Sequence, residues 1–176
     1  MFTDQEIKIA NATSRSNGAS AMNRDGTIRA VVPIFIEKNI DKRNRLLDFG
    51  AGKAAVHTKY LREHGFDVTA YDFGANCGDF HDKDALSKKY DIVFASNVLN
   101  VSSSINMLME TLQQIYNSIE CGGEFICNYP ISPRKMDMKP KELKSIIEHM
   151  FNNNAELVSG SNSAPVWRIK KERKTA

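Results

Sequence analysis

The chain has 176 residues, of which 41% are hydrophobic, and its 24 basic and 21 acidic side chains leave a formal net charge of +3. A chain of this length and composition is expected to form one globular domain with a buried core. The sequence contains no run of about eighteen uncharged apolar residues, and its first residues lack the basic and apolar regions of a secretory signal. Membrane insertion and export are therefore not predicted.

Cysteine usage and charge distribution add two expectations. Cys77, Cys121 and Cys127 are widely spaced and form no CxxC pair, which favours neither a disulfide framework nor a zinc ribbon and fits a cytoplasmic location. The segment Arg168–Ala176 holds five basic residues and one acidic residue, and residues 171–176, beyond the last predicted strand, are predicted to form a basic tail. Two interpretations of this basic tail stay open: a solvated chain end, or a segment that contacts the phosphates of a nucleic acid.

Residues 1–44 are predicted to form an N-terminal segment of helices and a loop. Asn11–Gly26 is rich in Asn, Ser and Gly, so it is interpreted as a loop after a short leading helix and as a candidate lid. Thr27–Asn39 has apolar residues at helical spacing, although Pro33 is expected to kink or split that helix.

From residue 45 to residue 170, short apolar runs alternate with helical patterns. The predicted strands are 45–49, 67–72, 91–96, 123–128, 155–159 and 165–170, and the predicted helices are 54–64, 103–120 and a segment from Pro140 that includes Phe151. This alternation predicts an α/β fold with a doubly wound, mostly parallel sheet and helices on both faces. Because only residues 160–164 separate the last two strands, those strands are predicted to form an antiparallel β-hairpin.

Ligands bind open parallel sheets at the carboxyl ends of the strands. At the end of the first strand, Gly50 and Gly52 permit a tight turn and let a ligand lie against bare backbone. The second strand ends at Asp72, twenty residues beyond Gly52, where a carboxylate can accept hydrogen bonds from both hydroxyls of a ribose. Together these features predict a nucleotide-like ligand.

Two such ligands are compatible with this pattern, a nicotinamide dinucleotide and S-adenosylmethionine. Asp48 lies two residues before the first glycine, where a carboxylate would repel a pyrophosphate but not a sulfonium with an amino-acid tail. The residues Lys53–Ala55 could still complete a dinucleotide-binding turn, so the turn alone leaves both ligands open. The terminal hairpin favours the methyl donor, because dehydrogenase sheets usually end in further parallel strands.

Four segments resemble the successive motifs of class I, Rossmann-like S-adenosylmethionine-dependent methyltransferases. They are Leu47–Gly52, Tyr71–Asp72, Asp91–Asn97 and Gly122–Phe125. The resemblance covers about residues 45–170 and implies a seven-stranded sheet whose last strand is antiparallel. It also implies that the glycine loop passes beneath the methionine portion of the cofactor, that Asp48 orients this loop or the cofactor's amino group, that Asp72 binds the ribose and that Phe73 lies against the adenine. The predicted cofactor-binding residues are Asp48, Gly50, Ala51, Gly52, Asp72, Phe73, Asp82, Ser96 and Asn97.

The sequence departs from the family pattern in two places. Ala54 stands where a third glycine is common. Only 18 residues separate Asp72 from Asp91, too few for the usual helix, third strand and second crossover, so one of these is expected to be shortened or absent. The acidic residue that contacts adenine in the family is then Asp82 or Asp84, with Asp79 a weaker alternative.

Histidines and acidic residues suggest no further site. The stretch Asp79–Asp84 has the composition of a metal-ligand cluster, but its spacing matches no metal signature, so no metal site is predicted. His57 and His64 are interpreted as surface or packing residues.

The methyl acceptor is expected beyond the strand that ends at Ser96–Asn100. In enzymes that methylate amines of DNA and RNA, a polar residue, two prolines and an aromatic residue at this position hold a flipped base. Here Asn97 supplies the amide, and Tyr129, between Asn128 and Pro130, supplies a ring after the next strand. Asn97 and Tyr129 are therefore the predicted catalytic residues; alternatively, Asn97 and Asn100 satisfy buried backbone groups.

The predicted function is methyl transfer from S-adenosylmethionine by in-line displacement. A nucleic-acid base or nucleotide amine is the first candidate acceptor, since Ser96–Asn100 resembles a segment of small methyltransferases from phages and DNA-modification gene clusters. A small molecule or a protein side chain is the second. The remaining hypotheses are a non-catalytic cofactor-binding subunit that regulates a partner, and an NAD-dependent oxidoreductase.

Overall fold

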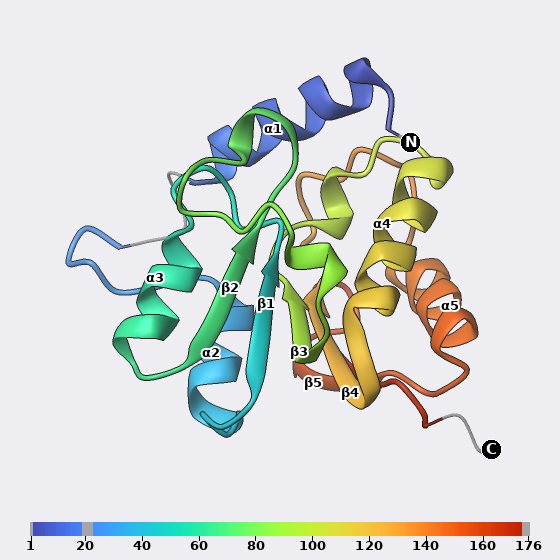
Figure 1. Ribbon diagram of the computed structural model, residues 1–176. Helices are drawn as coiled ribbons and strands as arrows, with labels where there is room; N and C mark the ends of the chain where they lie inside the picture. Colours follow the sequence, from blue (N-terminus) through green and yellow to red (C-terminus); the bar gives the residue numbers. More distant parts are fainter. Residues whose placement is uncertain (1, 19–22, 174–176) are drawn as a thin grey trace.

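The computed structural model describes residues 2–18 and 23–173 and contains one mixed sheet in the order β2-β1-β3-β4-β6-β5 (Figure 1). Its strands are β1 (Arg45–Phe49), β2 (Asp67–Tyr71), β3 (Tyr90–Ala95), β4 (Ile119–Asn128), β5 (Glu156–Gly160) and β6 (Pro165–Lys170). β1 is parallel to β2 and β3, and β3 is parallel to β4, whereas β6 is antiparallel to β4 and β5. The predicted fold class and the terminal hairpin are confirmed.

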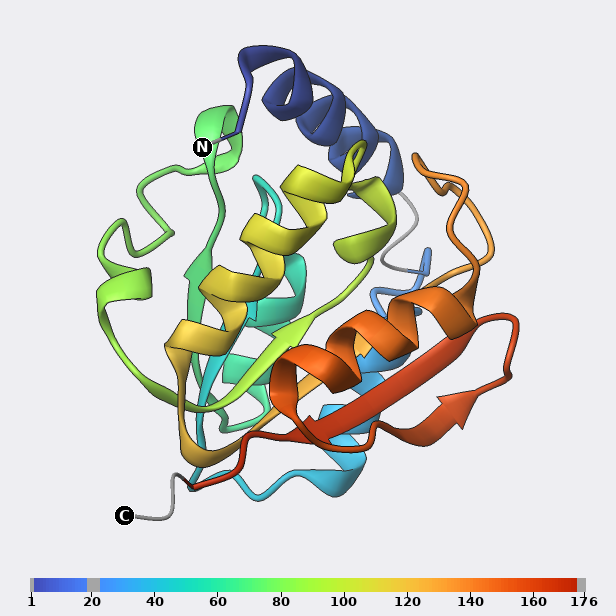
Figure 2. The same cartoon turned by 90° about the vertical axis from the view of Figure 1, so that its right-hand side faces the viewer.

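The helices are distributed over both faces of the sheet and its carboxyl edge (Figures 1 and 2). They are α1 (Asp4–Gly18), α2 (Val31–Asn39), α3 (Val56–Glu63), α4 (Ile105–Ser118) and α5 (Pro140–Phe151). α2 and α3 pack on one face and α4 and α5 on the other, so that the sheet separates two hydrophobic cores. α1 crosses the carboxyl ends of the strands, where it contacts the turns at residues 74–76 and 99–101.

β3 illustrates why this sequence forms a central strand. Ile92 and Phe94 enter the core under α2 and α3, whereas Val93 and Ala95 enter the core under α4 and α5. Successive side chains of a strand point to opposite faces, so a parallel strand with helices on both sides needs an unbroken apolar run.

The region between β2 and β3 contains no third strand. All of residues 72–89 are described, and they form only two short 3₁₀ turns, Gly74–Asn76 and Ala85–Ser87. β2 is therefore an edge strand, and its outward carbonyls are covered: the Val68 oxygen accepts from Arg62 Nε at 2.7 Å and the Ala70 oxygen from the Asp82 N–H at 2.9 Å. Such covering of an edge discourages pairing with another chain. The expected shortening is confirmed.

The N-terminal segment differs from the prediction. α1 continues to Gly18 through residues that were expected to form a loop. A capping box between Thr3 and Glu6 starts the helix, and Ala10 packs in a small cluster with Val101 and Met107. This packing outweighs the weak helix propensity of Asn and Ser. The part of the predicted lid at residues 19–22 lies outside the described residues.

Three other element boundaries differ from the prediction. α2 begins at Val31, so Pro33 lies in its first turn, where no intrahelical N–H bond is needed, and the helix is not split. α3 begins only at Val56, because Ala55 adopts a left-handed conformation with φ of 46°. α4 ends at Ser118, and β4 starts at the next residue, so Gly122 lies within the strand rather than at a helix end.

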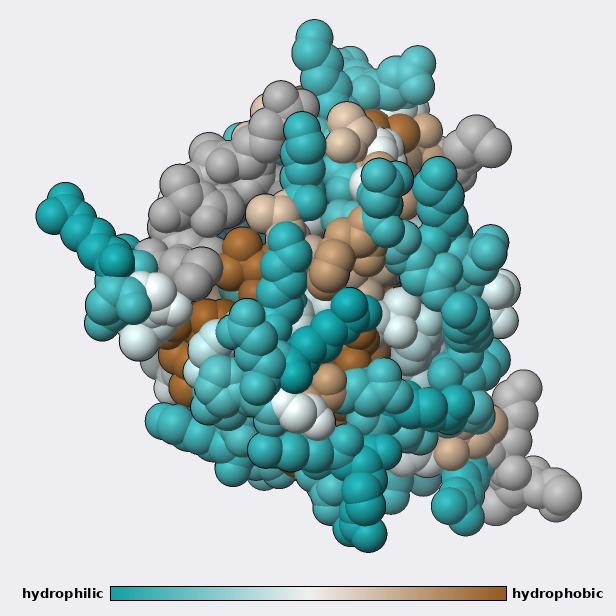
Figure 3. All heavy atoms as spheres, turned by 60° about the vertical axis from the view of Figure 1, so that its left-hand side comes forward, coloured by the Kyte–Doolittle hydropathy of each residue, from teal (hydrophilic) through white to brown (hydrophobic). Residues whose placement is uncertain are grey.

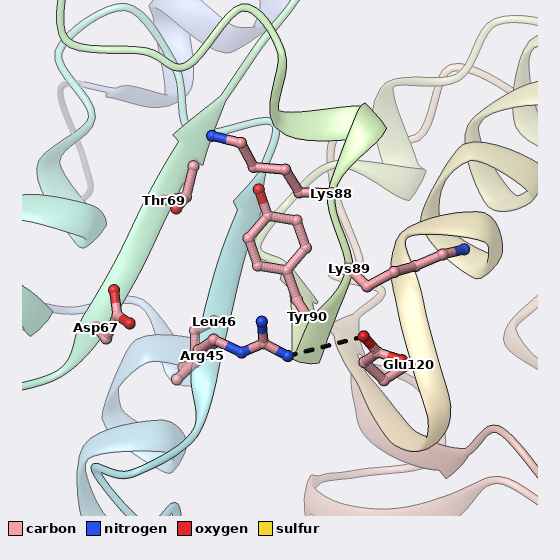
Figure 4. Close-up of a pocket in the computed structure, with 8 residues that line it drawn as sticks. All are labelled: Arg45, Leu46, Asp67, Thr69, Lys88, Lys89, Tyr90 and Glu120. Carbon is pink, nitrogen blue, oxygen red and sulfur yellow. Dashed lines mark ion pairs between the residues drawn. The ribbon is translucent and has the colours of Figure 1, made fainter.

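Within the described ranges, no helix combines the length and the apolar character that crossing a membrane requires. A hollow of about 440 Å³ lies at the amino ends of β1, β2 and β3, away from the glycine loop (Figure 4). Two of its cationic side chains form ion pairs, since Arg45 lies 3.8 Å from Glu120 and Lys88 lies 2.6 Å from Asp82, and the third, Lys89, donates to the Asn117 carbonyl.

Candidate active site

The glycine loop at the end of β1 is held close to the ends of the neighbouring strands. Gly50 and Gly52 both have φ of 75°, a conformation that L side chains rarely adopt. The N–H groups of Gly50 and Ala51 both donate to the Tyr71 carbonyl, each at 2.9 Å. A Cβ at Gly50 would lie 2.6 Å from Cγ2 of Val98. The turn therefore requires glycine at this position.

Asp72 lies directly against the glycine loop. Its Oδ2 accepts the Gly52 N–H at 2.7 Å, and its Oδ1 accepts the Phe73 N–H at 2.8 Å. The residue is 5% exposed, and burial raises the pKa of its carboxyl group. Each carboxylate oxygen retains capacity to accept another hydrogen bond.

Asp48 lies beneath the loop and faces α3. Its Oδ2 accepts the hydroxyl of Thr58 at 2.7 Å, which ties the end of β1 to the helix that follows the loop. Burial, and to a lesser extent the nearby charge of Asp72, raises the pKa of Asp48 to about 7. Asp48 therefore connects the end of β1 to α3 through Thr58.

The raised pKa of Asp48 predicts a pH-dependent stability without cofactor. Because the ordinary pKa is 3.8, folded Asp48 holds a proton between about pH 4 and pH 7 that the unfolded chain releases, so its contribution to the free energy of unfolding falls as the pH rises through this window. Burial lowers the pKa of His57 to about 4, which gives an opposite contribution, so the slope due to Asp48 is the difference between the natural protein and Asp48→Asn. We expect Asp48→Asn to remove most of this slope and to stabilise the protein at pH 8 by up to about 4 kcal/mol. Urea unfolding at pH 5 and pH 8 measures this effect.

Exposed Asp67, with Asp67→Asn, is the matched control and should leave the slope unchanged. An unaltered slope in Asp48→Asn would mean that Asp48 is ionised in the folded protein at pH 5.

The end of β3 brings Ser96 and Asn97 to the same edge. The Ser96 hydroxyl is buried and has no hydrogen-bond partner among the described residues. Asn97 has φ of 57°, and it forms a reciprocal pair with Asn128 at the end of β4: the Asn97 N–H donates to Asn128 Oδ1 at 2.7 Å, and Asn128 Nδ2 donates to Asn97 Oδ1 at 2.8 Å. Asn128 was not among the predicted site residues.

The side chain of Tyr129 does not lie with Ser96 and Asn97 at the carboxyl ends of the strands. It is 2% exposed, its hydroxyl donates to the Met138 carbonyl at 2.7 Å, and the guanidinium of Arg134 covers its ring at 4.2 Å. The strand alternation explains the error, because Tyr129 and Cys127 share the core under α4 and α5, so Asn128 between them faces the other way. We therefore assign Tyr129 no catalytic role.

The remaining candidates for contact with adenine are the ring of Phe73 and the carboxylates of Asp79, Asp82 and Asp84. The Phe73 ring packs against Phe2, with ring centroids 5.2 Å apart. Asp82 is bound by Lys88 at 2.6 Å, and this hydrogen bond lowers the pKa of Asp82. Asp79 and Asp84 are exposed on the same short segment. The carboxylate of Asp82 is thus occupied by Lys88 rather than presented to the glycine loop.

His81 also reaches the glycine loop, although no motif in the sequence indicated this contact. It is 6% exposed, and its Nε2 lies 2.8 Å from the Gly52 carbonyl oxygen. Its role depends on the approach of two loops 29 residues apart in the sequence.

A hollow of about 500 Å³ lies beside the Asn97–Asn128 pair. It is lined by Arg29, Ala30, Val31, Asn97, Asn128, Pro130, Ile131, Ser132, Ala164 and Pro165. We call it the acceptor hollow. It combines two amides with exposed apolar side chains, since Val31 and Ile131 are 43% and 65% exposed.

Several features of the carboxyl edge match the needs of S-adenosylmethionine. The glycines leave room for a ligand against the backbone, each carboxylate oxygen of Asp72 can accept a further hydrogen bond, and the buried Ser96 hydroxyl has no partner among the described residues. When bound, this cofactor supplies a methyl group on a positively charged sulfur. The hairpin-ended sheet and the glycine loop define a class I S-adenosylmethionine-dependent methyltransferase.

The family comparison agrees with this class. The model of the family described as "Methyltransferase domain" matches residues 21–159, more than half of the chain, so the protein belongs to this family. No curated protein matches the chain. The chain is therefore an S-adenosylmethionine-dependent methyltransferase.

Solved structures share the fold at low sequence identity. A TehB-like SAM-dependent methyltransferase from Corynebacterium glutamicum is 16% identical, with a TM-score of 0.63, and the match covers 94% of this chain and 99% of that one. A 1,6-didemethyltoxoflavin-N1-methyltransferase from Burkholderia thailandensis, solved with 1,6-didemethyltoxoflavin and S-adenosylhomocysteine, is 15% identical, with a TM-score of 0.61 and coverages of 98% and 92%. TehB from Haemophilus influenzae is 16% identical, with a TM-score of 0.57 and coverages of 85% and 64%.

Proposed function

We propose that this methyltransferase acts on a small organic molecule and methylates an amine or ring nitrogen held in the acceptor hollow. The observation that carries the proposal is the position of this hollow beside the Asn97–Asn128 pair. Its volume of about 500 Å³ falls in the range of small-molecule sites. The Burkholderia thailandensis structure, whose bound 1,6-didemethyltoxoflavin is a small molecule, supports the same substrate class.

The amide pair suits a nitrogen acceptor. Asn97 Oδ1 and Asn128 Oδ1 each accept one hydrogen bond within the pair and have a second lone pair available. When these amide oxygens accept the N–H groups of a substrate amine, the lone pair of the amine nitrogen is oriented toward the methyl group. In-line transfer depends chiefly on such alignment and on the exclusion of water.

The charges near the hollow argue against a nucleic acid, the acceptor that the sequence favoured. Among the described residues that line the hollow, Arg29 alone carries a charge. Among the C-terminal basic residues, Arg168 of β6 pairs with Glu124, and Lys171 is 8% exposed and donates to the carbonyls of Tyr116 and Ile119. The resemblance of Ser96–Asn100 to phage and DNA-modification enzymes stays a prediction.

We infer that α1, rather than the loop that was predicted there, covers the cofactor. Ile7 and Asn11 lie against Gly74, where an added Cβ would be 2.9 Å from Ile7 Cγ2 and 3.1 Å from Asn11 Nδ2. The Ser104 hydroxyl also donates to Glu6. A helix fastened in this way would exclude water from the transferring methyl group.

The acceptor class can be tested by incubating the protein with methyl-labelled S-adenosylmethionine and cell extract. We expect label in the low-molecular-weight fraction, unaffected by nuclease or protease treatment of the extract. Label in RNA, DNA or protein would contradict a small-molecule acceptor, and cofactor binding without any transfer would favour the non-catalytic subunit.

Asn97→Gly tests the amide pair directly. Glycine removes the side chain but accepts the φ of 57°, so backbone strain is avoided. We expect the dissociation constant for the cofactor to stay within about twofold, while turnover of the labelled fraction falls by about 10–100-fold, as for lost positioning of a reactant. Asn152→Gly is the matched control, because Asn152 is also left-handed, with φ of 50°, but caps α5 far from the site. Equal loss of binding and turnover would assign Asn97 a structural role.

A further inference from the structure

The segment Gly78–Asp82, which we call the clamp segment, takes the place of the absent third strand beside β2. It is anchored on both sides of His81. The cationic groups of Lys59 and Arg62 on α3 each lie 4.9 Å from the centroid of the Phe80 ring. The Asp82 N–H donates to the Ala70 carbonyl of β2 at 2.9 Å. These anchors lie on the β2 side of the molecule, whose surface is mostly hydrophilic (Figure 3).

The two hydrogen bonds of His81 determine its tautomer. Nδ1 lies 3.1 Å from the Gly78 N–H, which can only donate, so Nδ1 is the unprotonated acceptor. Nε2 lies 2.8 Å from the Gly52 carbonyl, which can only accept, so Nε2 carries the hydrogen. Both ring nitrogens of the neutral imidazole are therefore used, one within the clamp segment and one on the glycine loop.

Gly52 is consequently fixed at both of its backbone polar groups. Its N–H donates to Asp72 at 2.7 Å, and its carbonyl accepts from His81 at 2.8 Å and from the Ala55 N–H at 3.2 Å. Because Gly52 has a φ of 75° and no side chain, external hydrogen bonds must hold its conformation. A loop held in advance loses less conformational entropy when a ligand binds.

We propose that His81 is a positioning residue for methyl transfer: its Nε2–H fixes the Gly52 carbonyl and thereby holds the glycine loop in the conformation that binds S-adenosylmethionine. His81 acts through Gly52 and takes no part in the transfer itself.

Three substitutions separate this role from simple packing. His81→Gln can place an amide N–H near the position of Nε2 and keep the bond to Gly52. His81→Asn is too short for that bond, but its carbonyl can accept the Gly78 N–H in place of Nδ1. His81→Ala loses both bonds, and His149→Gln, at an exposed histidine of α5, is the control.

Calorimetric titration with S-adenosylhomocysteine and thermal unfolding without ligand provide the readouts. We expect the dissociation constant to rise about tenfold in His81→Ala and His81→Asn, as for one lost hydrogen bond, and to stay within about threefold in His81→Gln. The unfolding temperatures of the Gln and Asn variants should be alike. Wild-type affinity in His81→Ala, or equal affinities in the Gln and Asn variants, would overturn the proposal; if His81→Ala does not fold, the Gln and Asn pair still decides.

Discussion

Gly50→Ala is expected to raise the dissociation constant for the cofactor at least about 100-fold above that of the natural protein. Two costs combine at this position. The backbone φ of 75° disfavours any L side chain, and the added Cβ would lie 2.6 Å from Val98 Cγ2, so the loop has to shift. We expect the free energy of unfolding to fall by about 1–3 kcal/mol as well. Titration with S-adenosylhomocysteine and urea unfolding measure the two effects.

Two further variants separate the costs. Gly26→Ala carries the conformational cost alone, since Gly26 has φ of 83° and no atom within 4 Å of an added Cβ, and it should leave cofactor binding intact. Val98→Ala combined with Gly50→Ala removes the steric conflict and should restore part of the affinity. If Gly50→Ala bound the cofactor as tightly as the natural protein, close approach of the loop to Val98 would be irrelevant to the site.

The strands and the glycine loop were predictable because local sequence specifies them. Continuous apolar runs and turn glycines place the glycine loop and the carboxylate of Asp72 at the carboxyl ends of neighbouring strands. In the structure the Gly52 nitrogen lies 2.7 Å from Asp72 Oδ2. The length of α1 was not predictable from composition. Its Asn-rich and Ser-rich sequence has weak helix propensity, and the helix depends on packing of Ala10 against Val101 and Met107.

The parts of the site that sequence reasoning missed depend on contacts between distant segments. His81 meets Gly52 across 29 residues, and Asn97 meets Asn128 across 31 residues. No periodicity or spacing encodes such pairs, because each depends on where two loops meet at the end of the sheet. Alternation along β4 indicates only that Asn128 faces away from the apolar Cys127 beside it, and it does not indicate the pairing with Asn97.

Asp72→Ala should weaken binding of S-adenosylmethionine by about 5–150-fold, or about 1–3 kcal/mol, because a buried charged acceptor is lost. Asp72 has two possible roles: it accepts the Gly52 N–H at 2.7 Å, and it is placed to accept ribose hydroxyls. 5′-Methylthioadenosine, which keeps the ribose and adenine but lacks the amino-acid portion, distinguishes these roles. If Asp72 binds the ribose, both ligands lose affinity by the same factor; if it acts only through the loop beneath the methionine portion, 5′-methylthioadenosine binds Asp72→Ala and the natural protein equally. Asp67→Asn serves as the control, and unchanged affinity for both ligands in Asp72→Ala would remove Asp72 from the cofactor site.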